Sequence, residues 1–334
     1  MLHFEWTGSH YEAGLRYGTA RRQMGMTLGR PEILQLTSEK LAFGRASMEI
    51  CRREYPEFLE ELEGIAQGQE IPLEELCAFF FGMYNFIGGH FCTSFAYRGP
   101  DGVVFGRNSD FAVALEPTNE NSYYHLTDGN AFVGNSTAPS QMEDGVNCHG
   151  LAVGLTLIYP TVKRPGLGAG ILTRYLLERC STVPEAVEEL GRLTISSNQT
   201  LTLADRAGRM AVVECNCQGM EVLEPEPGTD FVVATNSFHG VGMKRYNPAL
   251  EDTVFSGLRY QVAKKALDDR WGEPVAFAQE LLAGKFGFLC QYDRSKGMDT
   301  VWSSIYCLSS PGEIYRCEGN PSRQSFERDC RLKF

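Results

Sequence analysis

The sequence lacks the segments that mark export or insertion into a membrane. Its first residues, MLHFEWTGSHYEAG, contain neither a basic n-region nor an apolar h-region, so they do not resemble a secretory signal. No stretch approaches the roughly 18 apolar residues that a membrane-spanning helix needs. These absences predict a cytoplasmic protein that has no membrane partner.

Positive charge is also scarce. Lysine and arginine number 31 against 42 aspartates and glutamates, which gives a formal net charge of -11. No basic stripe runs along the chain, and an acidic protein of this kind repels phosphate backbones. We therefore do not expect nucleic acid as a partner.

The 11 cysteines lack the regular spacing of a disulfide framework or a zinc site. Their number is odd, and without an export signal they are expected to be reduced thiols. Cys215-Asn216-Cys217 and Cys148-His149 do not have zinc-site spacing. The glycine-rich run 166–170 lacks the leading strand and downstream acidic residue of a dinucleotide site. We expect neither a metal nor a cofactor.

The chain changes character near residue 90. Before it, helical patterns dominate, beginning with a capping box at Ser9 and Glu12. After it, strand and turn patterns alternate with helical stretches near 171–180, 184–193 and 256–284. There is no internal repeat, low-complexity run or evident linker. We predict a single domain over 1–334 with an α+β fold, in which antiparallel sheets carry helices on their outer faces.

One segment carries chemistry. His90-Phe91-Cys92-Thr93-Ser94 is followed by Gly106-Arg107-Asn108-Ser109-Asp110, with a GPDG turn between them. A tight hairpin brings Arg107 and Asp110 back to Cys92. An arginine beside a thiol lowers its pKa, and a carboxylate orients an amine. The spacing predicts a reactive cysteine.

Further motifs in the same order resemble the acyl-coenzyme A:6-aminopenicillanic acid acyltransferase family of N-terminal nucleophile (Ntn) hydrolases. The related choloylglycine hydrolases, which include penicillin V acylase, share several of them. The resemblance covers most of the chain. Its motifs are Gly8 to Gly14 with Gly18, Cys92-Thr93-Ser94, Gly106 to Phe111, Asp144 to Asn147, Ser197-Asn198, Leu203 to Asp205 with Gly208 and Glu214, Ala234 to Phe238, and Arg259-Tyr260.

This resemblance implies a four-layer αββα sandwich and autoproteolysis between Phe91 and Cys92. The products are a helical α chain, 1–91, and a catalytic β chain, 92–334. The family usually has glycine before its nucleophile, and Phe91 departs from that pattern.

For the mature enzyme we expect Cys92 to attack a linear amide and to form a thioester. Its own α-amine, with a pKa of about 7.7–8.0, serves as the base. Asp110 holds that amine, Arg107 supports the thiolate, and Asn236 donates to the oxyanion. The resemblance adds Asn147 as a second donor. The substrate is a small amide or acyl compound, and the two chains remain partners.

Several alternatives stay open. Cys92 can be a core thiol, Arg107 and Asp110 a surface ion pair, and Asn147 and Asn236 turn residues. Asn198 and Arg259 can be structural or can contact substrate. A papain-like pair of Cys92 with His90, His125, His149 or His239 lacks its local signature. The chain can also be an unprocessed, catalytically silent binding protein. The choice between hydrolysis and acyl transfer, and the presence of a homo-oligomer, are undetermined.

Overall fold

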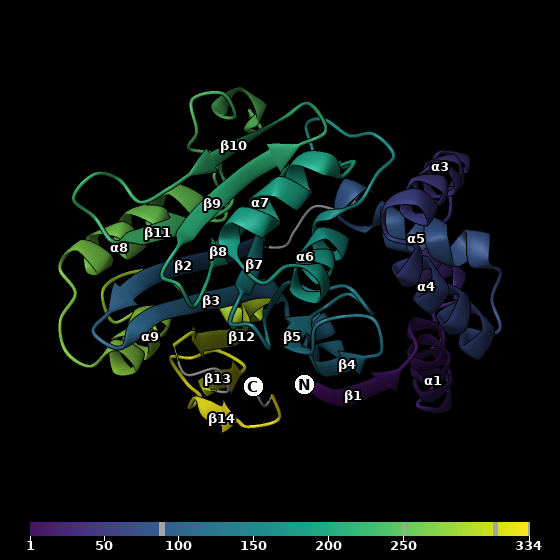
Figure 1. Ribbon diagram of the computed structural model, residues 1–334, viewed down its shortest axis with the longest axis horizontal. Coiled ribbons are helices and arrows are strands. Elements are labelled where there is room, and N and C mark those ends of the chain that lie inside the picture. The colour runs from purple at the N-terminus through teal and green to yellow at the C-terminus, as the bar shows by residue number, and fades with distance from the viewer. Residues whose placement is uncertain (87–90, 250, 310–312, 333–334) are drawn as a thin grey trace.

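The computed structural model describes residues 1–86, 91–249, 251–309 and 313–332, and two β-sheets stacked face to face form its centre (Figure 1). In spatial order, the larger sheet consists of β1 (Leu2–Gly8), β4 (Glu120–Leu126), β5 (Phe132–Ser136), β6 (Asp144–Asn147), β7 (Ala152–Leu157), β8 (Gln199–Ala204), β9 (Met210–Asn216) and β10 (Gly219–Leu223). The smaller consists of β11 (Phe231–Ala234), β2 (Phe91–Gly99), β3 (Gly102–Ala112), β12 (Met298–Cys307), β13 (Glu313–Glu318) and β14 (Glu327–Asp329).

Helices cover the outer face of each sheet. Helices α6 (Ala169–Arg179) and α7 (Val183–Arg192) pack on the larger sheet, whereas α8 (Ser256–Asp268) and α9 (Pro274–Leu282) pack on the smaller one. The inner faces meet where β2 contacts β7 and β8. Short 3-10 helices occur in the connections: η1 (Val113–Thr118), η2 (Lys244–Tyr246) and η3 (Arg294–Lys296). The order helix, sheet, sheet, helix confirms the predicted four-layer αββα architecture.

The helices that lie between β1 and β2 in the sequence gather at one end of the larger sheet, on the right of Figure 1. They are α1 (His10–Gln23), α2 (Pro31–Leu34), α3 (Ser38–Glu54), α4 (Pro56–Gln69) and α5 (Leu73–Phe86). The capping box of α1 is confirmed. The Ser9 hydroxyl accepts from the Glu12 amide at 3.2 Å, and the Glu12 carboxylate accepts from the Ser9 amide at 2.9 Å.

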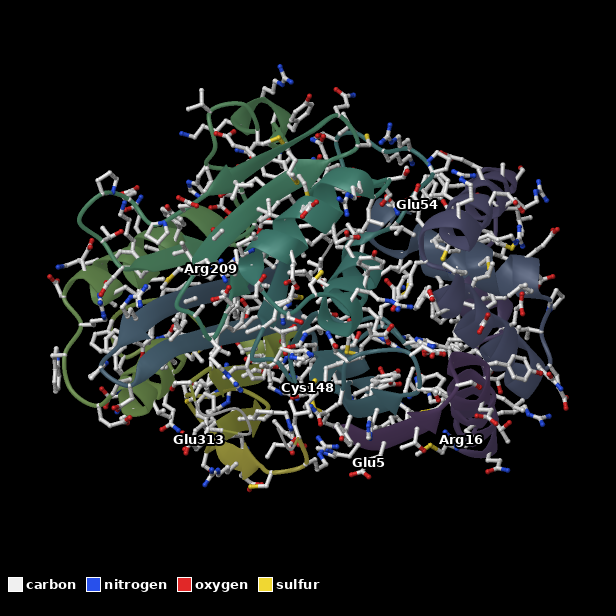
Figure 2. The ribbon with its side chains drawn as sticks, viewed as in Figure 1. Glu5, Arg16, Glu54, Cys148, Arg209 and Glu313 are labelled. Atoms are coloured by element: carbon white, nitrogen blue, oxygen red, sulfur yellow. The ribbon has the colours of Figure 1, made fainter. Side chains whose placement is uncertain are left out.

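The prediction of an all-helical segment before residue 90 is wrong at its start, where β1 lies. Leu2, Phe4 and Trp6 alternate with polar residues, which is the period of a strand, and the rings of Phe4 and Trp6 lie 5.2 Å apart. Glu5, on the other face of β1, and Arg16 of α1 lie at the surface (Figure 2). Strand β1 pairs with β4 in parallel, whereas the other strand pairs of the described residues are antiparallel.

The glycines of the N-terminal motif allow α1 to pack closely on α4. A Cβ atom added at Gly14 would lie 2.1 Å from the carbonyl oxygen of Glu61, and one at Gly64 would lie 2.2 Å from that of Tyr11. No side chain fits at such distances, so only glycine permits this contact. Gly14 of this motif therefore has a packing role, together with Gly64 of α4, in the contact between the two helices.

A buried charged cluster joins that helical segment to α6. The Arg174 guanidinium of α6 donates to Glu61 of α4 at 2.7 Å and to Glu178 at 2.6 Å. His10 of α1 lies 3.1 Å from Glu178, and the Tyr55 hydroxyl donates to the same carboxylate. These five side chains are buried. The cluster thus connects residues on both sides of the Phe91–Cys92 bond.

All 11 cysteines fall within the described residues, and each is a free thiol. Most of them are buried. No helix in the described part of the chain is long and apolar enough to cross a membrane. Burial therefore does not distinguish one cysteine of this chain from another, and any difference in reactivity has to come from the side chains around each thiol.

Candidate active site

The predicted hairpin around Cys92 is confirmed. Strands β2 and β3 pair in antiparallel register, with Phe91 opposite Asp110, Cys92 opposite Ser109, and Ser94 opposite Arg107. A tight turn between Gly99 and Gly102 closes the hairpin. The start of β2 and the end of β3 therefore lie side by side.

The Cys92 thiol is fully buried and lies against the Arg107 guanidinium. Arg107 Nη2 donates to Cys92 Sγ at 2.9 Å. The same Nη2 forms an ion pair with Glu143 at 3.3 Å, while Nη1 forms one with Asp144 at 2.9 Å and Nε donates to the carbonyl of Leu155. Two buried carboxylates therefore hold the guanidinium in place beside the sulfur.

Burial raises the pKa of the Cys92 thiol to about 12. Arg107 acts in the opposite direction, as the sequence predicts, whereas the charges of Glu143 and Asp110 add to the increase. Burial outweighs the effect of the arginine. At pH 7 a thiol with this pKa is ionised to only about 1 part in 10⁵. In the intact chain the Cys92 side chain is therefore held almost entirely as the neutral thiol.

The main chain of Cys92 is bound from both sides. Its amide donates to Asn236 Oδ1 at 3.0 Å, and its carbonyl accepts from Arg259 Nη1 at 2.6 Å. Arg259 Nη2 also donates to Asn236 Oδ1 at 2.6 Å, while Asn236 Nδ2 donates to the carbonyl of Leu157 at 2.7 Å. Asn236 thus accepts from the nitrogen of the Phe91–Cys92 bond in this form. Its role as an oxyanion donor stays a prediction.

Asp110 is buried next to these groups. Its carboxylate accepts from the hydroxyls of Thr300 at 2.6 Å and Tyr292 at 3.1 Å, and lies 3.9 Å from Arg259 Nη1. Burial raises the pKa of Asp110 to about 6, against the opposing effects of Arg259, Thr300, Tyr292 and Arg107. Asp110 is therefore poised to change charge just below neutral pH.

The buried groups around Cys92 carry charges of both signs. The guanidinium groups of Arg107 and Arg259 lie among the carboxylates of Asp110, Glu143 and Asp144. A buried charge is stabilised by a nearby charge of opposite sign. A cation that formed beside Cys92 would therefore lie close to carboxylates that can stabilise it.

Asn147 does not take part in this cluster. Its Nδ2 donates to the carbonyls of Leu177 at 2.9 Å and Cys180 at 2.7 Å, which uses both hydrogens, and its Oδ1 accepts from the amides of His149 and Leu151. The prediction of a second oxyanion donor is corrected: Asn147 holds the turn after β6 and the end of α6.

Asn198 holds a loop. Its Nδ2 donates to the carbonyls of Tyr159 at 2.9 Å and Tyr246 at 3.2 Å, and to Thr161 Oγ1 at 2.8 Å. Its Oδ1 accepts from Asn216. Asn198 therefore positions the segment that carries Tyr159, whereas Arg259, the other undecided candidate, contacts Cys92 directly.

The histidines considered for a papain-like pair bond elsewhere or lie outside the described residues. His149 Nε2 lies 3.1 Å from Asn130 Oδ1, and His239 Nε2 lies 3.3 Å from Ser237 Oγ. His125 is exposed, and His90 lies outside the described residues. Within the described ranges there is also no group of three or more side chains arranged to hold a metal ion.

Four supporting side chains were not predicted from the sequence. Glu143 and Asp144 bind Arg107, and Tyr292 and Thr300 bind Asp110. Asp144 belongs to one of the motifs behind the family resemblance, and that motif was the signal in the sequence that could have indicated its contact with Arg107. Tyr292 and Thr300 come from the far end of the chain, and nothing in their local sequence indicates the contact.

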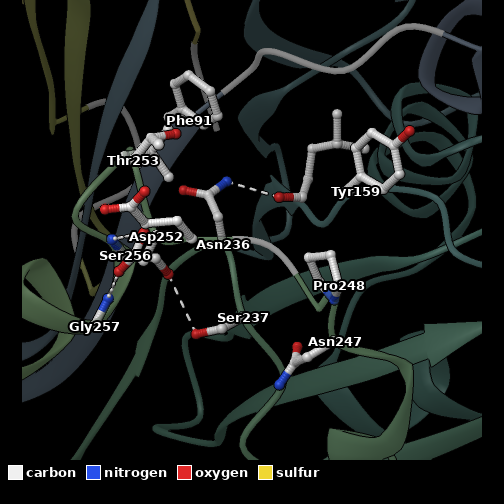
Figure 3. A pocket seen from close by; sticks show the side chains of 13 residues that line it. Phe91, Tyr159, Asn236, Ser237, Asn247, Pro248, Asp252, Thr253, Ser256 and Gly257 are labelled. Atoms are coloured by element: carbon white, nitrogen blue, oxygen red, sulfur yellow. Dashed lines mark hydrogen bonds between the residues drawn. The ribbon is translucent and has the colours of Figure 1, made fainter.

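A pocket of about 480 Å³ opens beside Phe91 and Asn236 (Figure 3). Its walls also come from Leu157, the last residue of β7, from Tyr159 just after that strand, and from the segment that leads into α8. The volume falls in the range of small-molecule sites. The bond that precedes Cys92 thus borders a space large enough for a substrate.

Comparisons with known proteins agree with this architecture. The sequence profile of the acyl-coenzyme A:6-aminopenicillanic acid acyl-transferase family matches residues 97–323. A mutant of conjugated bile acid hydrolase from Clostridium perfringens superposes with a TM-score of 0.51 at 16% identity, over 72% of this chain and 93% of that chain. Penicillin V acylase from Agrobacterium tumefaciens gives 0.46 at 17% identity, over 73% and 99%. No curated protein sequence matches. The similarity to the bile acid hydrolase structure is a similarity of fold.

Proposed function

Because the chain belongs to the acyl-coenzyme A:6-aminopenicillanic acid acyl-transferase family, whose profile covers more than half of its 334 residues, we propose that it is a self-activating cysteine amidohydrolase or acyltransferase. It cuts itself between Phe91 and Cys92 and then cleaves linear amides through a thioester on Cys92. One observation carries the proposal: Arg107 binds the Cys92 thiol while Asn236 and Arg259 bind the main chain of the same residue.

Self-cleavage begins with attack of Cys92 Sγ on the carbonyl carbon of Phe91. The S–C bond forms, the C–N bond of the peptide breaks, and the thiol proton passes to the nitrogen of Cys92. Water then hydrolyses the thioester, which leaves a carboxylate on Phe91 and a thiol on Cys92. Because Asn236 already accepts from this nitrogen, the new α-amine forms with an acceptor in place.

The new amine changes the electrostatics of the site. An ammonium group at Cys92 adds a positive charge close to the carboxylates of Asp110 and Glu143, both of which act on the Cys92 thiol. An opposite charge within about 4–6 Å lowers the pKa of an acid by about 1–3 units. The ammonium therefore lowers the pKa of the Cys92 thiol, and cleavage increases the fraction of the more nucleophilic thiolate.

Substrate turnover repeats the same chemistry. The thiolate attacks the amide carbonyl, the S–C bond forms, the C–N bond breaks, and the ammonium gives its proton to the departing amine. Water, or a second amine, then attacks the thioester and releases the acyl group as an acid or a new amide. Asp110 holds the ammonium, and Arg107 stabilises the sulfur. Since both outcomes use one thioester, hydrolysis and acyl transfer are variants of this mechanism.

Intact mass under denaturing conditions tests the proposal directly. We expect two chains that meet at residue 92, one of 91 residues and one of 243 (334 minus 91). The β chain should begin with a free cysteine amine. A fully active protein that runs as one 334-residue chain would contradict the mechanism. An inactive single chain would favour the silent binding protein.

Tyr292→Phe should shift the pH dependence of turnover. The hydroxyl of Tyr292 stabilises ionised Asp110, so its loss raises the pKa of Asp110 further above its ordinary value. A hydrogen bond to a charged group contributes about 1.5–3 kcal/mol, and 1.36 kcal/mol equals one pKa unit. The acidic limb of kcat/KM, where Asp110 becomes protonated, should therefore move upward by about one pH unit.

Tyr175→Phe is the matched control, because Tyr175 also donates to a carboxylate, that of Glu189, but lies in α6. Tyr175→Phe should leave the pH of the acidic limb of kcat/KM unchanged. If Tyr292→Phe also leaves that limb unchanged, Asp110 is not the group whose ionisation limits turnover.

A further inference from the structure

We propose that the pocket beside Phe91 binds the acyl group of the substrate, and that this group is apolar and carries no negative charge. The inference rests on the proposed function and specifies which substrates that function serves. It follows from three features: the position of Phe91, the side chains of the walls, and the charge at the rim.

Phe91 identifies the acyl side of the site. In the one amide bond that the chain itself presents to Cys92, Phe91 supplies the carbonyl and Cys92 the nitrogen. The nitrogen is bound by Asn236, and Phe91 lines the pocket, with its ring facing the same space as the Asn236 side chain (Figure 3). Self-cleavage and turnover form the same kind of thioester. The group attached to a substrate carbonyl therefore enters the space that Phe91 lines in the uncleaved chain.

The walls of the pocket are largely apolar. Leu157, Tyr159, Pro248 and Val254 line it together with Phe91. The Tyr159 loop is held by Asn198, and the carbonyl of Val254 accepts from Arg259 Nε at 3.1 Å. These bonds fix the two sides of the pocket relative to the site. A preformed, apolar cavity favours an apolar ligand group.

The charge at the rim excludes anions. Glu251 and Asp252 line the pocket, and no lysine, arginine or histidine is among the described residues that do so. Asp252 accepts from the amides of Ser256 at 2.8 Å and Gly257 at 2.9 Å, so the start of α8 already has its acceptor and offers no anion site. Arg259 is occupied by Cys92, Thr93 and Asn236. An acyl group that ends in a carboxylate would meet like charge without a cationic partner.

A pair of substrates tests the charge. Hexanoyl and adipoyl amides of one fluorogenic aromatic amine have acyl chains of the same number of carbons, and only the second ends in a carboxylate. With wild-type protein we expect kcat/KM to be at least about tenfold higher for the hexanoyl amide, since each tenfold corresponds to about 1.4 kcal/mol. An equal or higher value for the adipoyl amide would overturn the inference while leaving the proposed function intact. Turnover of no amide would overturn both.

Gly257→Leu tests the location. A Cβ at Gly257 would meet only the Asp252 carboxylate, at 3.6 Å, and Gly257 lines the pocket, so we expect a larger side chain at this position to narrow it. We expect KM for the hexanoyl amide to rise about tenfold or more, with that for the acetyl amide changed less than about twofold. Gly191→Leu is the control, because Gly191 is also an exposed helical glycine, in α7, and an added Cβ there would meet only the end of the Met220 side chain, at 3.8 Å. Equal effects of Gly257→Leu on both amides, or no effect on either, would place the acyl group elsewhere.

Discussion

Replacing Cys92 by alanine should leave one chain of 334 residues and no measurable turnover. The methyl group cannot form the S–C bond on which both self-cleavage and amide cleavage depend. The fold should persist, because Arg107 keeps its ion pairs with Glu143 and Asp144 when the sulfur is absent. Intact mass, a continuous amide-cleavage assay and a thermal unfolding curve measure the three outcomes on one preparation.

Two other variants give this experiment its controls. Cys92→Ser keeps an oxygen nucleophile with a higher pKa than the thiol, so self-cleavage should slow rather than stop. Cys215→Ala removes a thiol that is equally buried, in β9, and should leave both cleavage and turnover in place. If Cys92→Ala is still cut before residue 92, or Cys215→Ala is inactive, the assignment of the nucleophile fails.

The local part of this site could be predicted from the sequence. Eighteen positions separate Cys92 from Asp110, and a hairpin closed by the tight turn between Gly99 and Gly102 brings the end of the second strand back to the start of the first. The alternation of strand residues then sets which side chains lie opposite each other. The pattern of strands and helices predicted an α+β fold, and the four-layer arrangement followed from the family resemblance.

The contacts between distant segments could not be predicted. Arg107 reaches Glu143 and Asp144 across the two sheets, and the spacing of residues within one hairpin carries no information about a neighbouring sheet. The pKa of Cys92 shows the consequence. The sequence predicts the effect of the adjacent arginine, but the larger effect comes from burial, which depends on every layer that surrounds the thiol.

Asn147 illustrates a second limit. A family motif marks the residue, but the motif does not say whether the amide faces the nucleophile or the backbone. In the structure its donors are used by Leu177 and Cys180. An asparagine at the end of a strand satisfies backbone groups more readily than it remains available to a ligand.

Arg174→Met should destabilise the protein by about 3–5 kcal/mol, because it removes the cation that pairs with buried Glu61 and leaves Glu178 with His10 as its remaining ion-pair partner. Arg174 also lies over the ring of Tyr124, at 3.7 Å from its centroid, so part of its packing is lost as well. The effect should extend beyond stability. Glu61 belongs to the segment before Phe91 and Arg174 to the segment after it, so in a cleaved protein the two chains should separate more readily. Chemical denaturation and size-exclusion chromatography measure the two effects.

The exposed arginine of α7, Arg192, is the control that separates the effect of burial on the unfolding free energy from the effect of losing an ion pair. Arg192 bonds to Glu188 at 2.5 Å and to Glu189 at 2.7 Å, but it is largely exposed, so Arg192→Met should change the unfolding free energy by less than about 1 kcal/mol. Adding Glu61→Gln to Arg174→Met should restore part of the stability, since it removes the buried charge whose ion pair the first change broke. Equal losses for Arg174→Met and Arg192→Met, or a further loss on adding Glu61→Gln, would mean that the cluster contributes through packing and not through its ion pairs.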